Sequence, residues 1–175
     1  MALPLQTRSL RLRPLTDADE TFYCRLYTDA AVMTRVGPPL TQEAAQGAFT
    51  RVLRQVATTP PRSQYWILHA QAADARLGLM ALVPDRDDPA SAEVGVLLLP
   101  EAQGQGYATE AIAALADSVF AVPGLQKLWT RHASGHAAAV GLMRRLGFVA
   151  GPGTSEAGAQ SRWQLLRGSW SDTRS

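Results

Sequence analysis

Apolar residues recur along this chain at two different spacings, and the spacing separates helices from strands. One stripe repeats at intervals of three or four residues, which matches the 3.6-residue turn of an α-helix. Its members are Ala45, Ala48, Phe49, Val52, Leu53 and Val56. The stripe stops before Pro60 and Pro61, and proline disrupts a helix interior. We therefore predict an amphipathic helix that ends before these prolines.

Three further helices are predicted around it. Small and apolar side chains share one face of residues 106–121, and residues 137–146 form a helix that Gly147 closes. Near the start of the chain, Thr16 and Asp19 have the spacing of a capping box, which opens a helix up to about Tyr27. About four helices are thus expected.

Strands are indicated by short apolar runs that lack the helical spacing and are bounded by turn residues. In the first of them, Leu10 and Leu12 alternate with two arginines. The others cover residues 65–70, 77–83, 92–99, 127–133, 148–150 and 161–168. The strands at 65–70, 77–83 and 92–99 should form a meander, and the whole order of elements predicts an α+β domain around one mixed sheet. Residues 151–160 are predicted to be a mobile loop.

The composition limits the kinds of function that come into question. The 175 residues fit one domain, which we expect to span 1–175. A single cysteine, Cys24, excludes an intramolecular disulfide and a cysteine metal cluster. No apolar run is long enough for a membrane span and no signal peptide is evident, so we expect a cytoplasmic protein. The net charge of +2 is too small and scattered for a nucleic-acid surface.

The segment QGQGYATEA at residues 103–111 is the strongest candidate for a ligand site. It joins the strand at 92–99 to the helix at 106–121, and the free N–H groups and dipole of a helix start attract anions. Glycines in such a turn let a phosphate reach the backbone. A P-loop would need Gly-Lys-Ser/Thr at the helix start, and the chain has Gly-Tyr-Ala. A dinucleotide fingerprint fails at Thr109 and lacks its downstream acid.

A third pattern, Gln/Arg-x-x-Gly-x-Gly/Ala, is satisfied by Gln103, Gly106 and Ala108. With it, four segments in the same order resemble the GNAT superfamily of N-acetyltransferases, and within it the ribosomal-protein-alanine (RimJ/RimL-like) branch. These segments are TRSLRLRPLTDAD (7–19), RLGLMAL (76–82), EVGVLLLPEAQGQGYATEA (93–111) and AVGLMRRLGF (139–148). One such motif alone would be weak, but four in order cover most of the chain.

The resemblance implies a fold, a cofactor and a set of binding residues. The family's sheet is mostly antiparallel and splayed between its fourth and fifth strands, where the pantetheine arm of acetyl-CoA lies. Backbone groups at Leu97 and Leu98 would pair with that arm. The pyrophosphate would lie on the amides of the following turn, which comprises Gln103, Gly104, Gln105, Gly106, Tyr107 and Ala108. No metal is implied.

Acetyl transfer to an amine also needs a base, because a lysine amine titrates near 10.4 and an α-amine near 8. Glu93 begins the strand that would meet the cofactor, on the face shared by Gly95 and Leu97, and the resemblance makes it the candidate base. A strand-end carboxylate in solvent is the alternative interpretation. His69 is a weaker candidate, and a partly buried strand residue explains it as well.

Two positions depart from the family pattern. His136 and Ala139 stand where many relatives have an asparagine and a serine. Met143 stands where many acetyltransferases have the tyrosine that protonates the departing thiolate, as the resemblance to this branch implies. In one interpretation His136 takes the place of the asparagine at the cofactor, with a pH dependence between about 6 and 7. In the other it is a residue at the helix start that faces solvent. The departures leave open a non-catalytic acyl-CoA-binding regulatory module with the same fold.

The expected partner is an amine-bearing acceptor, either a small molecule or a protein N-terminus. Acceptor choice in such folds depends on the first two helices and on the loops at 34–40 and 151–160, and these segments carry no readable code. A homodimer is left open, and neither nucleic acid nor a membrane is expected as a partner.

Overall fold

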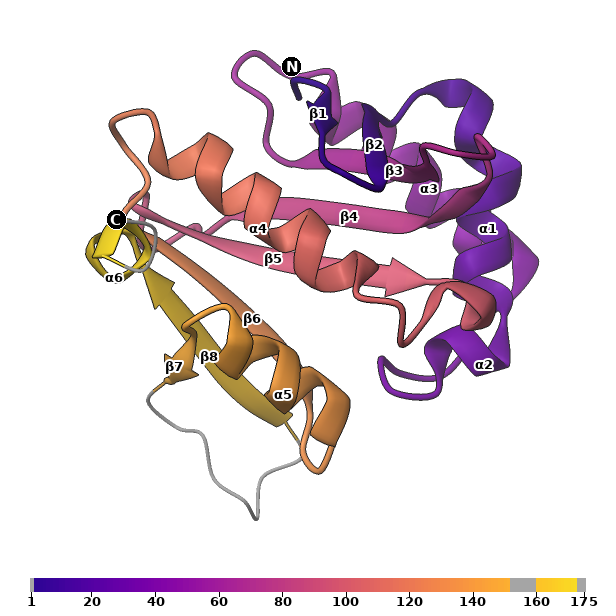
Figure 1. Cartoon of the computed structure of the whole chain (residues 1–175). Helices are drawn as coiled ribbons and strands as arrows, with labels where there is room; N and C mark the ends of the chain where they lie inside the picture. Colours follow the sequence, from indigo (N-terminus) through magenta and orange to yellow (C-terminus); the bar gives the residue numbers. More distant parts are fainter. Residues whose placement is uncertain (1, 152–159, 173–175) are drawn as a thin grey trace.

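A computed structural model describes residues 2–151 and 160–172, and an eight-stranded sheet runs through it (Figure 1). The strands are β1 (Leu5–Gln6), β2 (Leu10–Pro14), β3 (Gln64–Ala70), β4 (Arg76–Pro84), β5 (Ser91–Leu98), β6 (Lys127–Ala133), β7 (Val149–Ala150) and β8 (Gln160–Leu166). They are ordered β1-β2-β3-β4-β5-β6-β8-β7, and every neighbouring pair is antiparallel except β5 and β6. The predicted α+β class, the mixed sheet and the β3–β4–β5 meander are confirmed.

The helices follow the predicted stripes closely. They are α1 (Glu20–Thr28), α2 (Ala30–Met33), α3 (Gln42–Val56), α4 (Tyr107–Phe120), α5 (Ala137–Arg145) and α6 (Arg167–Asp172), with the 3-10 turns η1 (Asp17–Asp19) and η2 (Pro100–Ala102). Three elements were not predicted, namely β1, α2 and α6. Each is too short for a hydrophobic period to show in the sequence.

The sheet separates two hydrophobic cores, because successive side chains of a strand point to opposite faces. On β3, Trp66 and Leu68 face the core that contains the buried side of α4 and α5. Ile67 lies between them in sequence and faces the other core, together with α1, α2 and α3. Figure 1 shows the same arrangement, with α4 and α5 in front of the sheet and α1 to α3 behind it.

The capping box predicted at Thr16 is present and fixes the start of α1. The Thr16 N–H donates to Asp19 Oδ2 at 2.8 Å, and Arg13 donates to both carboxylate oxygens of Asp19 at 3.0 and 2.7 Å. Burial alone would raise the pKa of Asp19, which is 1% exposed, but the bonds from Arg13 and Thr16 outweigh it and lower this pKa. The ion pair between Asp19, the residue before α1, and Arg13 therefore fixes the start of α1 against strand β2.

The sheet opens between β5 and β6. These two strands pair only at Ser91–Lys127, Ala92–Leu128 and Glu93–Trp129, and beyond the last pair they diverge (Figure 1). The predicted splay between the fourth and fifth strands of the sequence pattern is confirmed, since those strands are β5 and β6.

Two sequence expectations concern segments away from the sheet. The loop predicted at 151–160 lies for the most part outside the described residues, which resume at Gln160. Among the helices that the structure describes, none is both long and apolar enough to cross a lipid bilayer.

Candidate active site

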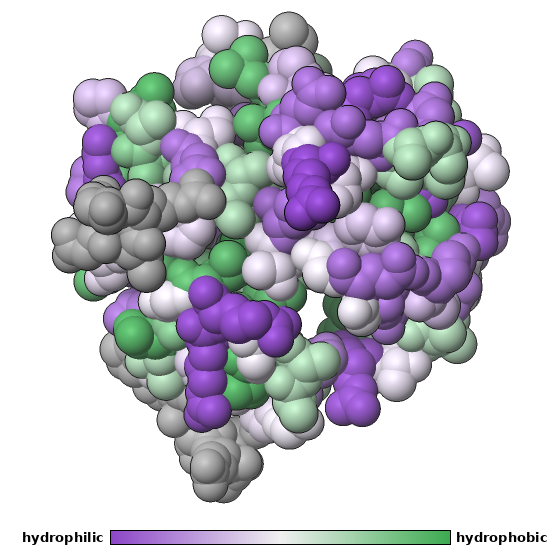
Figure 2. Space-filling model, viewed as in Figure 1, coloured by the Kyte–Doolittle hydropathy of each residue, from purple (hydrophilic) through white to green (hydrophobic). Residues whose placement is uncertain are grey.

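The candidate site is the slot that forms where β5 and β6 separate. After Glu93 and Trp129 neither strand has a paired neighbour on the side that faces the other. Backbone groups at such an edge are available to a ligand, since each residue carries a donor and an acceptor. Figure 2 shows the surface hollowed between the part of the molecule that carries α4 and the part that carries α5. The slot can therefore receive an extended ligand along a strand edge.

A glycine on the neighbouring strand sets the position of the end of β5. A Cβ atom at Gly78 would lie 2.1 Å from the carbonyl oxygen of Leu97 and 2.8 Å from the side chain of Leu98. Such distances are far inside van der Waals contact, so only glycine permits this approach of β5 to β4. Leu97 and Leu98 are thereby held against β4, at the end of the β5 edge that borders the slot.

The turn that follows β5 presents backbone donors. Gly104 and Gly106 have φ angles of 74° and 85°, in the left-handed region that glycine adopts without strain, and Gly106 caps α4. The backbone N–H groups of residues 104–109 have no acceptor within the described part of the chain. A Cβ at either glycine would meet nothing within 4 Å, so there is open space beside the turn. Free donors at a helix start are suited to an anionic ligand.

Two glutamine side chains brace this turn instead of lining it. Gln103 Nε2 donates to the carbonyl of Leu98 at 3.1 Å, and Gln105 Nε2 donates to the carbonyl of Glu101 at 2.7 Å. Tyr107 is partly buried and packs against the core below α4, and the neighbouring Ala108 is half-buried as well. Any contribution of residues 103–108 to anion binding thus falls to their backbone, as the sequence analysis expected.

Glu93 lies at the last paired position of β5, on the slot side of the sheet opening. Its two carboxylate oxygens accept from Arg131 of β6, from Nε at 3.1 Å and from Nη2 at 3.2 Å. Such a fork is the strongest geometry between a guanidinium and a carboxylate. Arg131 lies two residues after Trp129, the last residue of β6 that pairs with β5, so the Glu93–Arg131 pair bridges the two strands where they begin to separate. The pair both orients Glu93 and closes this end of the slot.

A tyrosine lies near Glu93 on the same face of the sheet. Burial raises the pKa of Tyr65 to about 12, with smaller contributions from Tyr27 and Glu93, and Ser63 opposes the rise through a hydrogen bond. The phenol is therefore uncharged at neutral pH. Tyr65 lies on β3, on the sheet face to which the side chain of Glu93 also points.

On the other wall of the slot, His136 caps the start of α5. Its side chain makes no capping hydrogen bond, and its ring meets that of His132 edge-on with 6.1 Å between centroids. Burial lowers the pKa of His136, and the charges of Arg35 and His132 lower it further. Since Arg35 belongs to the loop after α2, the segment 34–40 and the start of α5 face each other here.

Comparison with known protein families shows to which family this chain belongs. A family model described as "Acetyltransferase (GNAT) domain" matches residues 9–149, which is most of the chain. The protein belongs to the GNAT acetyltransferase family. The matched range includes the slot, the glycine turn of this GNAT domain and both residues of the Glu93–Arg131 pair.

Solved structures of GNAT proteins have the same fold. An acetyltransferase from Agrobacterium tumefaciens is 22% identical, with a TM-score of 0.75 over 94% of this chain and 95% of the other. A spermidine N-acetyltransferase from Vibrio cholerae, solved with CoA and spermine, is 21% identical, with a TM-score of 0.77 over 94% and 99%. RimL, a ribosomal L7/L12 α-N-protein acetyltransferase solved with CoA, is 13% identical, with a TM-score of 0.78 over 94% and 98%. No curated protein sequence matches this chain significantly.

His69 does not join the GNAT site. It pairs with Arg76 at one end of β4, whereas Glu93 pairs with Val83, seven residues further along, or about 23 Å away at 3.3 Å per residue. His69 is 8% exposed, and its Nδ1 atom lies 3.2 Å from the carbonyl oxygen of Asp74. The structure therefore agrees with the interpretation of His69 as a buried strand residue.

Met143 and the thiol of Cys24 are also parts of the packing. Met143 is 4% exposed and belongs to the core below α5, and Cys24 is free and buried on α1. In the residues that the structure covers, no group of three or more histidine, cysteine or acidic side chains could hold a metal ion.

Two residues at the site were missed by the sequence analysis, Arg131 and Tyr65. Alternation along β6 places Trp129 and Arg131 on one face, which the sequence could have indicated. Which residue of β5 they meet depends on the register of a parallel pair, and no sequence signal fixes that register. Tyr65 carried no signal beyond that of an apolar strand.

Proposed function

We propose that this protein is an acetyl-CoA-dependent N-acetyltransferase that acts on a primary amine: a protein N-terminus, an amino acid or another small amine. The observation that carries the proposal is the coincidence of two features. The open strand edge after Glu93 and the donor-rich turn at Gly104 and Gly106 are consecutive along the chain and lie at one slot. We further propose that residues 1–175 form one such domain, of the RimJ/RimL-like branch.

The residues present fit acetyl-CoA. The backbone N–H groups of residues 104–109 would hold its phosphates, and the edge of β5 that has no strand partner beyond Glu93, up to Leu98, would hold the extended arm that leads to the acetyl group. His136, on the opposite wall, would contact the same arm. Bound acetyl-CoA supplies an activated acetyl group for direct attack by the amine.

In this proposal Glu93 is the base that removes the amine proton. At neutral pH a primary amine is mostly protonated, and only the neutral amine attacks the acetyl carbon. Glu93 is placed to accept the proton directly or through a water molecule. Since both of its oxygens are held by Arg131, its orientation is fixed before the acceptor binds.

The relatives support an amine acceptor without naming one. The neighbours act on spermidine and on the N-terminus of a ribosomal protein, and these acceptors share only the amine. We therefore propose the reaction class alone at this point.

Two observations favour a second candidate, an acyl-CoA-binding module without turnover. Each carboxylate oxygen of Glu93 already accepts one hydrogen bond from Arg131, and His136 and Ala139 replace the asparagine and the serine of the family pattern. The two candidates are separated by mixing the protein with acetyl-CoA and a panel of amines and measuring the free thiol released. We expect thiol release that requires an amine. CoA binding without thiol release for any amine would establish the module instead.

A further inference from the structure

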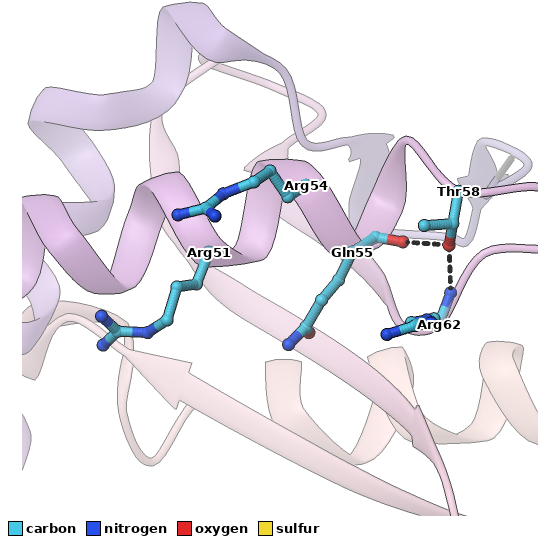
Figure 3. Close-up of a pocket in the computed structure, with 5 residues that line it drawn as sticks. All are labelled: Arg51, Arg54, Gln55, Thr58 and Arg62. Carbon is cyan, nitrogen blue, oxygen red and sulfur yellow. Dashed lines mark hydrogen bonds between the residues drawn. The ribbon is translucent and has the colours of Figure 1, made fainter.

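A hollow at the C-terminal end of α3 carries arginines that no carboxylate neutralises. It measures about 390 Å³ and is lined by Arg51, Arg54, Gln55, Thr58 and Arg62 (Figure 3). In the described part of the chain none of the three guanidinium groups has a carboxylate oxygen within 4.0 Å. Other arginines of the protein do have such partners, namely Arg11, Arg13, Arg25, Arg76, Arg131 and Arg162. The hollow therefore has an uncompensated positive charge.

The groups that face this hollow are hydrogen-bond donors. Gln55 Oε1 accepts from the hydroxyl of Ser63 at 2.9 Å, and Ser63 is fully buried. The carboxamide oxygen of Gln55 thus accepts from a buried group. The NH₂ group of Gln55, like the guanidinium groups, can only donate. Figure 3 shows the Gln55 side chain between those of Arg51 and Arg62.

Thr58 holds the loop that brings Arg62 back towards α3. Its hydroxyl donates to the carbonyl of Gln55 at 2.8 Å and accepts from the Arg62 N–H at 3.0 Å, as drawn in Figure 3. With this hydroxyl engaged, the hollow offers positive charge and N–H donors. A carboxylate or a phosphate group satisfies both.

The hollow lies on the same side of the sheet as Glu93. Ser63 comes one residue before Gln64, which pairs with Leu82, so Ser63 stands opposite Val83, and Val83 pairs with Glu93. Two strand spacings therefore separate Ser63 from Glu93, which is roughly 10 Å. Because Gln55 of the hollow is hydrogen-bonded to Ser63, the hollow lies within one side chain's reach of this position.

We propose that Arg51, Arg54 and Arg62 bind an anionic group of the acceptor, a carboxylate or a phosphate, while its amine lies at Glu93. This inference rests on the proposed function. An extended peptide advances 3.3 to 3.6 Å per residue, so the anion of a peptide acceptor belongs at about its third or fourth residue. A polyamine carries only positive charge, and these arginines repel it.

The test uses pentapeptide amides with alanine at every position except the third, which is aspartate, asparagine, phosphoserine or lysine. Calorimetry measures their binding to the CoA-loaded protein, and thiol release gives KM and kcat. We expect the aspartate and phosphoserine peptides to bind about five to ten times more tightly than the asparagine peptide, and the lysine peptide more weakly. The preference should appear in KM, with kcat changed less than about twofold.

The double variant Arg51→Gln/Arg54→Gln should remove this preference, and Arg51→Glu should shift it towards the lysine peptide. Arg8→Gln is the matched control, because Arg8 is an exposed arginine next to Glu110 of α4, on the other face of the sheet. Thermal unfolding should show that all variants remain folded, since the replaced side chains are exposed.

Equal binding of the aspartate and asparagine peptides to the unmodified protein would overturn the inference and leave the arginines as a solvated surface. An equal loss in Arg8→Gln would overturn it as well. The proposed function fails separately, if none of the peptides is acetylated. The calorimetric comparison of peptides and variants still decides the anion site in that case.

Discussion

At the residue scale, the proposed role of Glu93 as the base rests on its pair with Arg131. The bond lengths of 3.1 and 3.2 Å describe a carboxylate held by one guanidinium at the point where two strands separate. The pair gives Glu93 a fixed orientation, which a base needs if the amine is to meet it without further rearrangement.

Replacement of Glu93 by glutamine tests the role of the base. We expect Glu93→Gln to lower kcat/KM at pH 7 by about 100-fold, with a smaller loss above about pH 9, where more of the amine is already neutral. The measurement is the pH–rate profile of both proteins with one amine. CoA affinity should stay unchanged, and a rate loss equal at all pH values would assign Glu93 a structural role.

His136 gives a second prediction at this scale. Since the folded protein lowers its pKa, the unfolded chain binds the proton more readily. The free energy of unfolding should therefore fall as the pH drops below about 6.5, and continue to fall until the folded-state pKa is passed. The sequence analysis placed the pH dependence of a contact between His136 and the cofactor between about 6 and 7, and burial, with the charges of Arg35 and His132, lowers the pKa of this residue.

The variant His136→Asn should lose that part of the pH dependence and bind CoA at least as well as the unmodified protein, because asparagine restores the family's residue. Urea unfolding at pH 7.5 and pH 5.5 measures the first effect, and calorimetry the second. If both proteins lose the same stability between these pH values, the histidine does not titrate as the structure requires.

At the element scale, the slot depends on how closely β5 approaches β4. The close contact of Gly78 with Leu97 predicts that Gly78→Ala forces the backbone of β5 to move. We expect a loss of about 1–3 kcal/mol in the free energy of unfolding, together with weaker CoA binding. Gly95→Ala is the matched control on β5, where an added Cβ meets nothing within 4 Å. An equal effect of the two substitutions in urea unfolding would refute this account of the slot.

The same scale shows what the sequence can predict and where it stops. The stripe from Ala45 to Val56 predicted α3 because one element's own spacing decides it. The glycines at 104 and 106 indicated the turn because left-handed backbone favours glycine. The contact of Glu93 with Arg131 was missed, since it depends on the register between strands separated by a whole helix. The arginine hollow was missed for a similar reason: Arg62 is folded back onto α3 by Thr58.

At the scale of the whole molecule, the site is the boundary between two parts of one sheet. The part from β1 to β5 contributes Glu93, Tyr65 and the glycine turn, and the part from β6 to β8 contributes Arg131 and His136. The three residue pairs between β5 and β6, the Glu93–Arg131 pair and the packing of α4 against α5 all hold these parts together at the slot. The opening is thus built into the topology and requires no strained segment.

The central claim is that this opening binds CoA through the turn at Gly106, and calorimetric titration of CoA tests it most directly. Gly106→Val adds a branched side chain in the space beside the donors and should weaken binding about tenfold or more. Gly124→Val is the matched control, since Gly124 also has a positive φ of 127° in open space but lies beyond the far end of α4. We predict that the control keeps the affinity of the unmodified protein. Equal affinity of all three proteins for CoA would contradict the account.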